Sequence, residues 1–337
     1  MALYYRPLLQ SGPARPDDAL TMGGGWTWFS HVEVLSRDSV ARIVPVSEVP
    51  EEALRRLTAQ RSPIAGLAMD TPNVMGILNV TPDSFSDGGK HASLETALSG
   101  AETMAGSNIL DVGGESTRPG ATLVPKAEEI DRTAPVIEAL RSSGVSKPIS
   151  IDTRKAAVAE AALAAGANLV NDVSGFTFDS ELAPLCARLG VPVCVMHAQG
   201  DPATMQNQPK YDNVLLDVYD FLAGQIDRLE QLGIARAQIV ADPGIGFGKT
   251  LEHNLALLSR LSLFHSLGVP LLLGASRKKF IGTLGGEDTA SRRMPGSVAV
   301  ALAALKQGTQ IVRVHDVHET VQAIALWQAV VAGEVHG

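Results

Sequence analysis

The sequence has little of several features that would place it in a specialised class of protein. Of its 337 residues, two are cysteines and 4% are aromatic. Cys186 lies in a predicted helix and Cys194 in a predicted strand, and a disulfide framework or a structural zinc site needs more cysteines than this. We interpret both residues as buried free thiols, which argues against a disulfide-stabilised scaffold.

Positive charge and long apolar segments are also missing. The formal net charge is -8 at pH 7, so no basic surface is available for nucleic acid or anionic lipid, and any phosphate site must be local. No apolar run approaches the ~18 residues of a membrane span, and the N-terminus lacks the charged-then-apolar pattern of a signal peptide. We therefore expect a cytoplasmic protein with small-molecule ligands and without nucleic-acid or membrane partners.

The chain divides into two regions with different patterns. Residues 1–72 contain the strand-like segments Val32–Leu35 and Arg42–Val46 and a helix predicted from Pro50, with two glutamates in its first turn. We predict a small α+β extension for residues 1–72, whose role is not readable, and one larger domain for residues 73–337.

From Val74 onward, short apolar segments alternate regularly with helical segments. Eight strand-then-helix units in about 260 residues predict a (β/α)8 TIM barrel more readily than an open doubly wound sheet. The predicted strands are Val74–Val80, Ile109–Gly113, Pro148–Ile151, Leu169–Val170, Pro192–Val195, Gln238–Ala241, Pro270–Leu273 and Ile311–Val312.

Side chains able to bind a ligand follow the predicted strands at the points where they end. Asn79 ends the first strand and opens a long polar loop that runs to Gly89. The carboxyl ends of barrel strands meet at one mouth, where active sites lie. We therefore expect a single site to contain Asn79, Asp152, Asn171, Met196, Asp242, Lys278, Arg313 and His315.

Some of these residues have structural alternatives. Asp152 could instead cap the helix predicted from Lys155, and Asn171 could be a turn residue. Asp242 is harder to explain in this way, because it directly follows a buried apolar run and an unpaired carboxylate there would be costly. A ligand with two adjacent N–H groups would satisfy it.

Basic residues are predicted on the other side of the mouth. Arg118, Lys278 and Arg313 come from three different strand ends of an acidic protein, and such a local cluster indicates an anionic group such as phosphate. We therefore expect a ligand with an amide-like donor edge at one end and phosphate at the other.

Two further patterns resemble known sites without matching them. Gly244–Thr250 resembles a phosphate-binding loop, but Pro243 stands where that motif needs glycine, and Lys249 stands where the dinucleotide fingerprint needs its third glycine. His315 and His318 are three residues apart, yet further zinc ligands are not near them in the sequence. We interpret His318 as a solvated residue at a helix start.

Seven segments resemble those of the dihydropteroate synthases, the folate-pathway enzymes that join 6-hydroxymethyl-7,8-dihydropterin pyrophosphate to p-aminobenzoate. They are spread over the chain from Val74 onward and leave the N-terminal extension outside the resemblance. The segments are Ile77–Gly89, Glu115–Gly120, Ile151–Thr153, Asn171–Gly175, Asp242–Gly248, Ser276–Lys278 and Arg313–Asp316. The first two are highly specific, whereas Lys279 departs from the serine that is common in the family.

The resemblance implies roles for the residues of the mouth. A pterin site would contain Asp152, Asn171, Met196, Asp242, Lys278 and Arg313. A pyrophosphate site would contain Asn79, Arg118, Arg313 and His315, with Mg2+ bound by Asn79 and phosphate oxygens. A p-aminobenzoate slot, which sulfonamides would also occupy, would be lined by Phe85, Thr117, Pro119, Phe247 and Lys279. The catalytic residues would be Asn79, Arg118, Lys278, Arg313 and His315, acting by positioning and by stabilising separated charge.

Two other functions are compatible with parts of this pattern. A pterin-dependent methyltransferase is the alternative activity, because such enzymes hold a reduced folate in a similar barrel, but they do not need a pyrophosphate pocket. Arg118, Arg313 and His315 argue against it for that reason. A non-catalytic pterin-binding protein would be favoured by loss of Asp242 or by a degenerate loop after Asn79, and neither is found.

The resemblance also implies a homodimer, formed through barrel helices that lie away from the mouth. The alanine-rich segment Ser297–Leu305 and the final helix, near Val321–Val331, are the candidate face.

Overall fold

Parallel strands enclose the centre of the molecule. The computed structural model describes residues 2–80, 89–117, 121–200, 205 and 209–333, and in these ranges an eight-stranded parallel sheet has the order β11-β10-β9-β8-β7-β6-β13-β12. A bridge between Ala241 and Leu271 joins its two ends. The strands are β6 (Asn73–Asn79), β7 (Ile109–Gly113), β8 (Ile149–Asp152), β9 (Leu169–Asp172), β10 (Val193–Met196), β11 (Ile239–Asp242), β12 (Leu272–Leu273) and β13 (Ile311–Val314). The predicted (β/α)8 barrel is confirmed.

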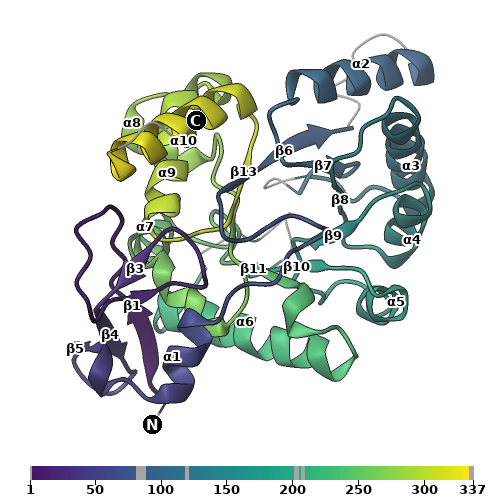
Figure 1. Ribbon diagram of the computed structural model, residues 1–337. Helices are drawn as coiled ribbons and strands as arrows, with labels where there is room; N and C mark the ends of the chain where they lie inside the picture. The colour runs from purple at the N-terminus through teal and green to yellow at the C-terminus, as the bar shows by residue number, and fades with distance from the viewer. Residues whose placement is uncertain (1, 81–88, 118–120, 201–204, 206–208, 334–337) are drawn as a thin grey trace.

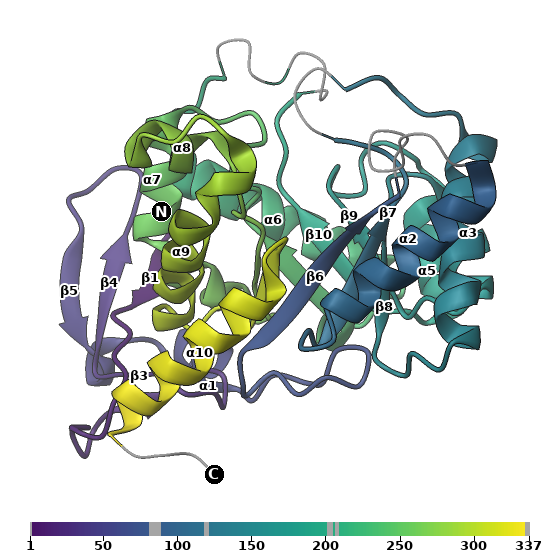
Figure 2. The same ribbon diagram turned by 90° about the horizontal axis from the view of Figure 1, so that it is seen from above.

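Helices cover the outside of this barrel (Figures 1 and 2). They are α2 (Gly89–Thr103), α3 (Lys126–Ser142), α4 (Ala156–Ala164), α5 (Leu182–Leu189), α6 (Val214–Gln231), α7 (Leu251–Ser259), α8 (Lys279–Gly285), α9 (Met294–Lys306) and α10 (Val317–Ala332), with the 3-10 helices η3 (Arg236–Gln238), η4 (Leu261–Leu267) and η5 (Ala290–Arg293). Within the described ranges, none of these helices combines the length and apolar character needed to cross a bilayer.

Residues of each strand alternate between the helices and the barrel interior, as the pleat of a strand requires. In β7, Leu110 and Val112 pack in the large core between strands and helices. Ile109 belongs to a separate cluster at the start of the strands, and Asp111 faces Arg313 across the interior. One strand therefore supplies both an apolar outer face and a charged inner face.

The N-terminal extension is built from small antiparallel sheets and one helix, as predicted. A three-stranded sheet has the order β1-β4-β5, and a second sheet pairs β2 with β3. The elements are β1 (Tyr4–Pro7), β2 (Leu20–Thr21), β3 (Trp28–Phe29), β4 (His31–Leu35), β5 (Arg42–Pro45), η1 (Val46–Glu48) and α1 (Glu51–Thr58).

This extension packs directly on the barrel wall. Tyr4 is 4% exposed and belongs to the barrel core, and its ring meets that of Tyr219 on α6 edge to face at 5.3 Å. The Tyr4 hydroxyl donates to Asp220 at 3.0 Å, and the Ser262 hydroxyl on η4 donates to the carbonyl of Pro7 at 2.9 Å. Figure 1 shows the extension beside α6 and α7, on the opposite side of the barrel from α3 and α4.

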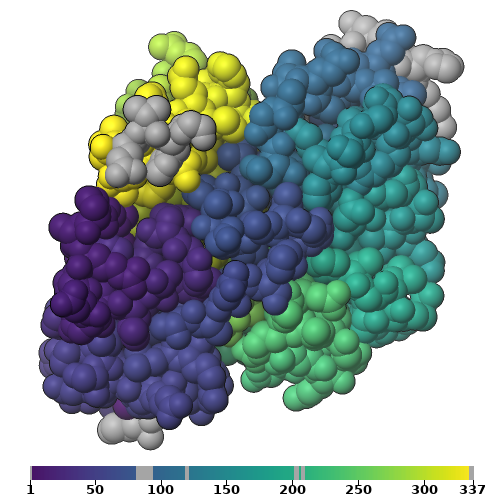
Figure 3. Space-filling view, in the orientation of Figure 1, coloured from purple at the N-terminus to yellow at the C-terminus, as the bar shows by residue number. Residues whose placement is uncertain are grey.

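The segment between α1 and β6 closes the N-terminal end of the barrel. Ile64 and Met69 are each 1% exposed and pack against the first inward residues of the strands, including Met75 and Ile109. The Asn73 amide fixes this segment by donating to the carbonyl of Ala68 at 2.8 Å. In Figure 3 the segment, in dark blue, fills the centre of the face between the extension and the barrel helices. Ligands must therefore enter from the other end.

Two minor expectations are also confirmed. Cys186 in α5 and Cys194 in β10 are buried free thiols. His318 is an exposed residue at the start of α10.

Because Tyr4 joins the extension to the barrel core, we expect Tyr4→Ala to lower the free energy of unfolding by about 3 kcal/mol, as for a buried aromatic truncated to alanine. Tyr4→Phe is the matched control: it keeps the ring and removes only the hydroxyl bond to Asp220, for a loss of about 1 kcal/mol. Urea denaturation of both variants measures the difference. A Tyr4→Ala protein as stable as the wild type would show that the extension adds nothing to the stability of the barrel.

Candidate active site in the barrel mouth

A guanidinium shared by two carboxylates lies inside the barrel. The Nε of Arg313 donates to Asp111 Oδ2 at 2.6 Å, and its Nη2 donates to Asp152 Oδ2 at 2.7 Å. The side chain of Asp111 is fully buried, that of Asp152 is 10% exposed and that of Arg313 is 20% exposed toward the mouth. The three charges connect strands β7, β8 and β13.

The protonation of this group is shifted by its surroundings. Burial raises the pKa of Asp152 to about 7, although Arg313 acts in the opposite direction. For Arg313, burial disfavours the charged form, but Asp111 and Asp152 outweigh it and raise the pKa of the guanidinium above its ordinary value. Arg313 therefore stays charged, whereas Asp152 can take up a proton near neutrality.

Asp152 and Asn171 both point into the barrel. The Asn171 amide donates to Asp111 Oδ2 at 3.4 Å, so this residue is not simply a turn former. The alternative that Asp152 caps the following helix is wrong, because the backbone N–H of Ala156 instead donates to Asp179 Oδ2 at 3.0 Å. Side chains far apart in the chain thus replace the local bonds that sequence alone allowed.

Asp242 ends β11 with one carboxylate oxygen held and the other facing the interior. Its Oδ1 accepts the backbone N–H of Gly244 at 2.7 Å, and the residue is 5% exposed. A Cβ on Gly274 would lie 3.7 Å from Asp242 Oδ2 and 3.8 Å from the Cδ of Arg313. Glycine at position 274 therefore leaves open the space between this carboxylate and the arginine. Burial raises the pKa of Asp242, with the charge of Lys278 opposing it.

Lys278 and Phe247 form one wall beside Asp242. The Lys278 ammonium donates to the carbonyl of Ile245 and lies 4.7 Å from the centroid of the Phe247 ring, a cation–π distance. Burial lowers the pKa of Lys278 to about 8, although Asp242 acts in the opposite direction. Lys279, the next residue, begins α8 and is exposed, whereas Met196 ends β10 and is buried.

Asn79 and His315 lie at the rim. A Cβ on Gly113 would lie 3.8 Å from both Asn79 Oδ1 and Asp152 Oδ2, so the amide and the carboxylate flank the same glycine. The imidazole Nδ1 of His315 is 3.0 Å from the Ser276 hydroxyl. Thr117 is partly exposed. Phe85, Arg118 and Pro119 lie outside the described residues.

Asp111 is a site residue that the sequence interpretation missed. It lies in the middle of an apolar strand, not at its end, and strand ends were the signal used. Because strands of a barrel are buried on both faces, a carboxylate inside one requires a cation or a polar partner. That rule would have identified Asp111 as an interior charge, although not its pairing with Arg313.

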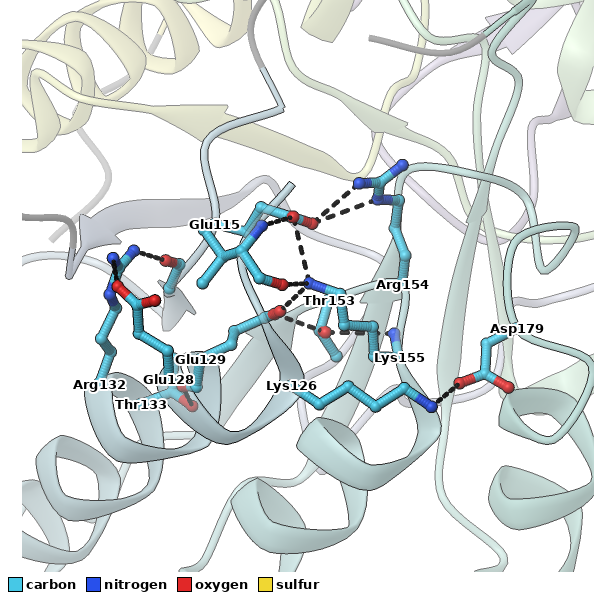
Figure 4. A network of polar contacts seen from close by, with 12 residues as sticks. Glu115, Lys126, Glu128, Glu129, Arg132, Thr133, Thr153, Arg154, Lys155 and Asp179 are labelled. Atoms are coloured by element: carbon cyan, nitrogen blue, oxygen red, sulfur yellow. Dashed lines mark hydrogen bonds and ion pairs between the residues drawn. The ribbon is translucent and has the colours of Figure 1, made fainter. Parts of the chain in front are cut away.

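A second charge network, also missed, lies behind the mouth (Figure 4). Lys155 donates to Glu115 Oε1 at 3.1 Å, to Glu129 Oε2 at 2.5 Å and to the carbonyl of Val124 at 2.7 Å. Glu115 also accepts the backbone N–H of Val124 at 2.8 Å and pairs with Arg154 at 2.9 Å. All four charged side chains are at most 7% exposed. The network joins the chain as it leaves β7 to the chain as it enters α3.

The mouth can hold a flat polar heterocycle. Asp242 and Asp152 offer acceptors, Asn171 and Lys278 offer donors, and the Arg313 guanidinium provides a planar surface with a positive charge. These groups lie above the apolar cluster that includes Met75 and Ile109. Binding among these groups would be directed by hydrogen bonds around the ring edge.

Comparison with known proteins gives one consistent result. The family described as "Pterin binding enzyme" matches residues 75–315. The dihydropteroate synthase of Escherichia coli strain K12 is 48% identical over 270 residues, which are 80% of this chain and 95% of that protein.

Solved structures agree with these sequence matches. The Yersinia pestis dihydropteroate synthase with a sulfonamide drug is 47% identical, with a TM-score of 0.74, over 78% of this chain and 96% of that chain. The Xanthomonas albilineans dihydropteroate synthase with 4-aminobenzoic acid is 46% identical, with a TM-score of 0.75, over 80% of this chain and 97% of that chain.

The raised pKa of Asp152 predicts a pH dependence of stability. In the unfolded chain this carboxyl ionises near its ordinary pKa of 3.8, whereas in the folded protein it does so near 7. Between these values the folded state keeps a proton that the unfolded state has lost. The stability that this provides is complete below pH 3.8 and is lost as pH rises toward 7. We expect the wild type, relative to Asp152→Asn, to lose up to about 4 kcal/mol across this window.

Urea denaturation of both proteins at several pH values between 4 and 8 measures this difference. Asp152→Asn keeps all the other titratable groups of the chain, so the difference in unfolding free energy between the two proteins reports on Asp152 alone. A difference between the two proteins that does not change with pH would mean that Arg313 keeps Asp152 ionised throughout.

Proposed function

The chain belongs to the dihydropteroate synthase family of pterin-binding enzymes, and from this membership we propose how its barrel mouth performs the reaction. The enzyme is a transferase that joins 6-hydroxymethyl-7,8-dihydropterin pyrophosphate to p-aminobenzoate, giving 7,8-dihydropteroate and pyrophosphate. The proposed assignment of the pterin site rests on Asp242, because one of its carboxylate oxygens accepts the Gly244 N–H and the other faces the barrel interior.

The pterin is proposed to lie in the barrel with its amino-pyrimidinone edge on Asp242. Two adjacent N–H groups on the ring would match this carboxylate, whose Oδ1 accepts the backbone N–H of Gly244. The remaining pterin contacts would come from Asp152, Asn171, Met196, Lys278 and Arg313. Arg313 is already oriented by Asp111 and Asp152, so its guanidinium plane would be available for stacking without reorganisation.

The pyrophosphate is proposed to bind at the rim, near Asn79, Arg118, Arg313 and His315. Mg2+ would be held there by the Asn79 amide oxygen and by phosphate oxygens, and when bound it would offset the charge of the leaving group. Asn79 fits this metal, because its amide supplies a hard oxygen donor and lies close to Gly113 at the rim. Over the described ranges, no cluster of three or more His, Cys, Asp or Glu side chains provides a protein cage, which suits an ion held mainly by substrate phosphates and water.

The p-aminobenzoate slot is proposed to lie beside the Lys278 and Phe247 wall, with Phe85, Thr117, Pro119 and Lys279 as its other members. The Xanthomonas albilineans relative was solved with this molecule, and the Yersinia pestis relative with a sulfonamide. An aromatic acid would find an apolar ring in Phe247 and a nearby positive charge in Lys278. We therefore also propose sensitivity to sulfonamides.

In the proposed reaction, the bond between the pterin methylene carbon and the pyrophosphate oxygen breaks, and pyrophosphate leaves with the electron pair. The electron-rich pterin ring stabilises the resulting cation, after which the arylamine nitrogen forms the new bond and loses a proton. No protein nucleophile or strong base is required. Arg313 and Lys278, fixed by Asp111, Asp152 and the Ile245 carbonyl, would supply preorganised positive charge in a buried site.

Three further properties are proposed. The N-terminal extension is assigned to residues 1–72 and the pterin-binding barrel to residues 73–337. The location is cytoplasmic, as the composition predicts. The assembly is a homodimer through α9 and α10, for which exposed apolar side chains on α10 provide support, because Leu326 is 63% and Val330 is 80% exposed.

The function and the pterin site are tested together by measuring pyrophosphate release that depends on p-aminobenzoate. The wild type should release pyrophosphate only when both substrates are present. Asp242→Asn should lose most of this activity, because its amide presents a donor toward ligand donors and a lost charge-assisted pair costs roughly 2 to 5 kcal/mol. Calorimetry with the pterin substrate gives the binding effect directly. Near-normal pterin affinity in Asp242→Asn would contradict the assignment of the site.

The dimer is tested by placing charge on α10. Leu326→Glu combined with Val330→Glu should give a folded monomer in light scattering at micromolar concentration, because like charges would face each other across a two-fold interface. Leu189→Glu on α5, where the leucine is 42% exposed, is the control and should leave the dimer intact. A wild-type protein that is already monomeric would refute this assembly.

A further inference from the structure

Lys249 is a buried lysine that the proposed reaction does not use. It is 2% exposed and lies at the end of the loop that leads from Asp242 to α7. Its ammonium is 2.8 Å from the carbonyl oxygen of Gly244, 3.1 Å from that of Phe247 and 3.3 Å from that of His197. It is also 2.8 Å from Nδ1 of the His197 ring. Burial lowers the pKa of Lys249 well below its ordinary value, although the charge of Asp242 acts in the opposite direction.

The four acceptors match the donor capacity of an ammonium group. Three N–H bonds can serve two carbonyls and the ring nitrogen, with the third carbonyl sharing a donor. A bond donated by Lys249 to Nδ1 requires the neutral His197 tautomer that carries its proton on Nε2. Burial lowers the pKa of His197 to about 2, and the charge of Lys249 adds to this effect. The ring is therefore neutral at any working pH.

The loop around Lys249 has the backbone form that this contact requires. Gly244, Gly246 and Gly248 have φ values of 68°, 84° and 62°, a left-handed conformation that favours glycine. A Cβ on Gly244 would lie 1.8 Å from the carbonyl oxygen of His197, and one on Gly248 would lie 2.3 Å from that of Gln199. The loop is therefore pressed against the chain that follows β10, with its carbonyls turned toward the ammonium.

Lys249 and Asp242 both form hydrogen bonds with the backbone of Gly244. Asp242 Oδ1 accepts the Gly244 N–H, and Lys249 donates to the Gly244 carbonyl. The backbone N–H of His197 in turn donates to the carbonyl of Asp242 at 3.0 Å. The orientation of the Asp242 carboxylate thus depends on the turn at Gly244, and the Lys249 ammonium binds the carbonyl of that turn. Lys249 also donates to the carbonyl of Phe247, and the ring of Phe247 faces Lys278.

We propose that Lys249 is a positioning residue for pterin binding, acting as an internal hydrogen-bond donor that draws the carbonyls of the loop together and so fixes Asp242 and Phe247 at the two sides of the site. This inference rests on the proposed function, since it assigns the pterin edge to Asp242. It accounts for a buried lysine whose ammonium group contacts three backbone carbonyls, in a loop that resembles a phosphate-binding loop.

Lys249→Met tests the inference, because methionine fills similar space without donors or charge. We expect the dissociation constant of the pterin pyrophosphate substrate, measured by calorimetry without p-aminobenzoate, to rise about tenfold or more, as for a misplaced binding group. The KM for this substrate should rise by more than kcat falls. Binding within about twofold of the wild type in a folded Lys249→Met protein would overturn the inference.

Lys147→Met is the matched control. Lys147 also donates to backbone carbonyls, those of Ala105 and Ser107, each at 2.8 Å, but it lies at the opposite end of β7 from the mouth. We expect this variant to lose stability while leaving pterin affinity unchanged. If both methionine variants weakened pterin binding equally, the effect would be a general loss of stability and the inference would be wrong.

Two further measurements keep the outcomes separable. Asp242→Asn reports on the pterin site itself: if it binds pterin normally, the proposed site fails, whereas if it loses binding and Lys249→Met does not, only the role of Lys249 fails. Should Lys249→Met not fold, 15N NMR of the wild type decides the matter. We expect unprotonated Nδ1 on His197 and slowly exchanging ammonium protons on Lys249. A proton on Nδ1 would overturn the inference.

Discussion

The guanidinium of Arg313, shared between Asp111 and Asp152, is the interaction on which the interior of the barrel depends. Its bonds of 2.6 and 2.7 Å cross from β13 to β7 and β8. Removing one member of a buried charged group leaves the others uncompensated, typically at a cost of 3 to 5 kcal/mol. The group is therefore both a structural tie between strands and the electrostatic basis of the site. Burial, with the charge of Asp111 adding to it, raises the pKa of Asp152, and the two carboxylates keep Arg313 charged where an anionic leaving group is proposed to depart.

The two ends of the barrel differ because inward side chains change from apolar to polar along the strands. At the start of the strands, Met75 and Ile109 pack with Ile64 and Met69 of the closing segment. Further along, several inward positions are polar or charged, and others are glycine. Gly274 leaves room between Asp242 and Arg313, and Gly113 does so beside Asn79 and Asp152. The closed apolar end stabilises the barrel and the polar end is free for chemistry, a division typical of this architecture.

Much of the site could be read from strand ends. Asp152 and Asn171 follow apolar segments and do face the interior, since a side-chain period of two places every second residue inside. The sequence left open which groups these side chains would bind by hydrogen bonds. Asp152 could equally have capped a helix, but its partner is Arg313, 161 residues away, and the N–H of Ala156 bonds Asp179 instead. Asp111 was missed because it is not at a strand end, and Lys249 because its motif resembles a ligand loop whose lysine points outward.

The sequence by itself determined the type and order of the elements, and it indicated that polar side chains follow the barrel strands where they end. These follow from local periodicity and turn residues, which act over a few positions of the chain. The tertiary structure alone decided which charges pair, because the partners of Arg313 are separated from it by 202 and 161 residues. It also decided that Tyr4 belongs to the barrel core and that Lys249 turns inward to three carbonyls. Burial and hydrogen-bond partners are properties of the folded structure, and no local sequence pattern specifies them.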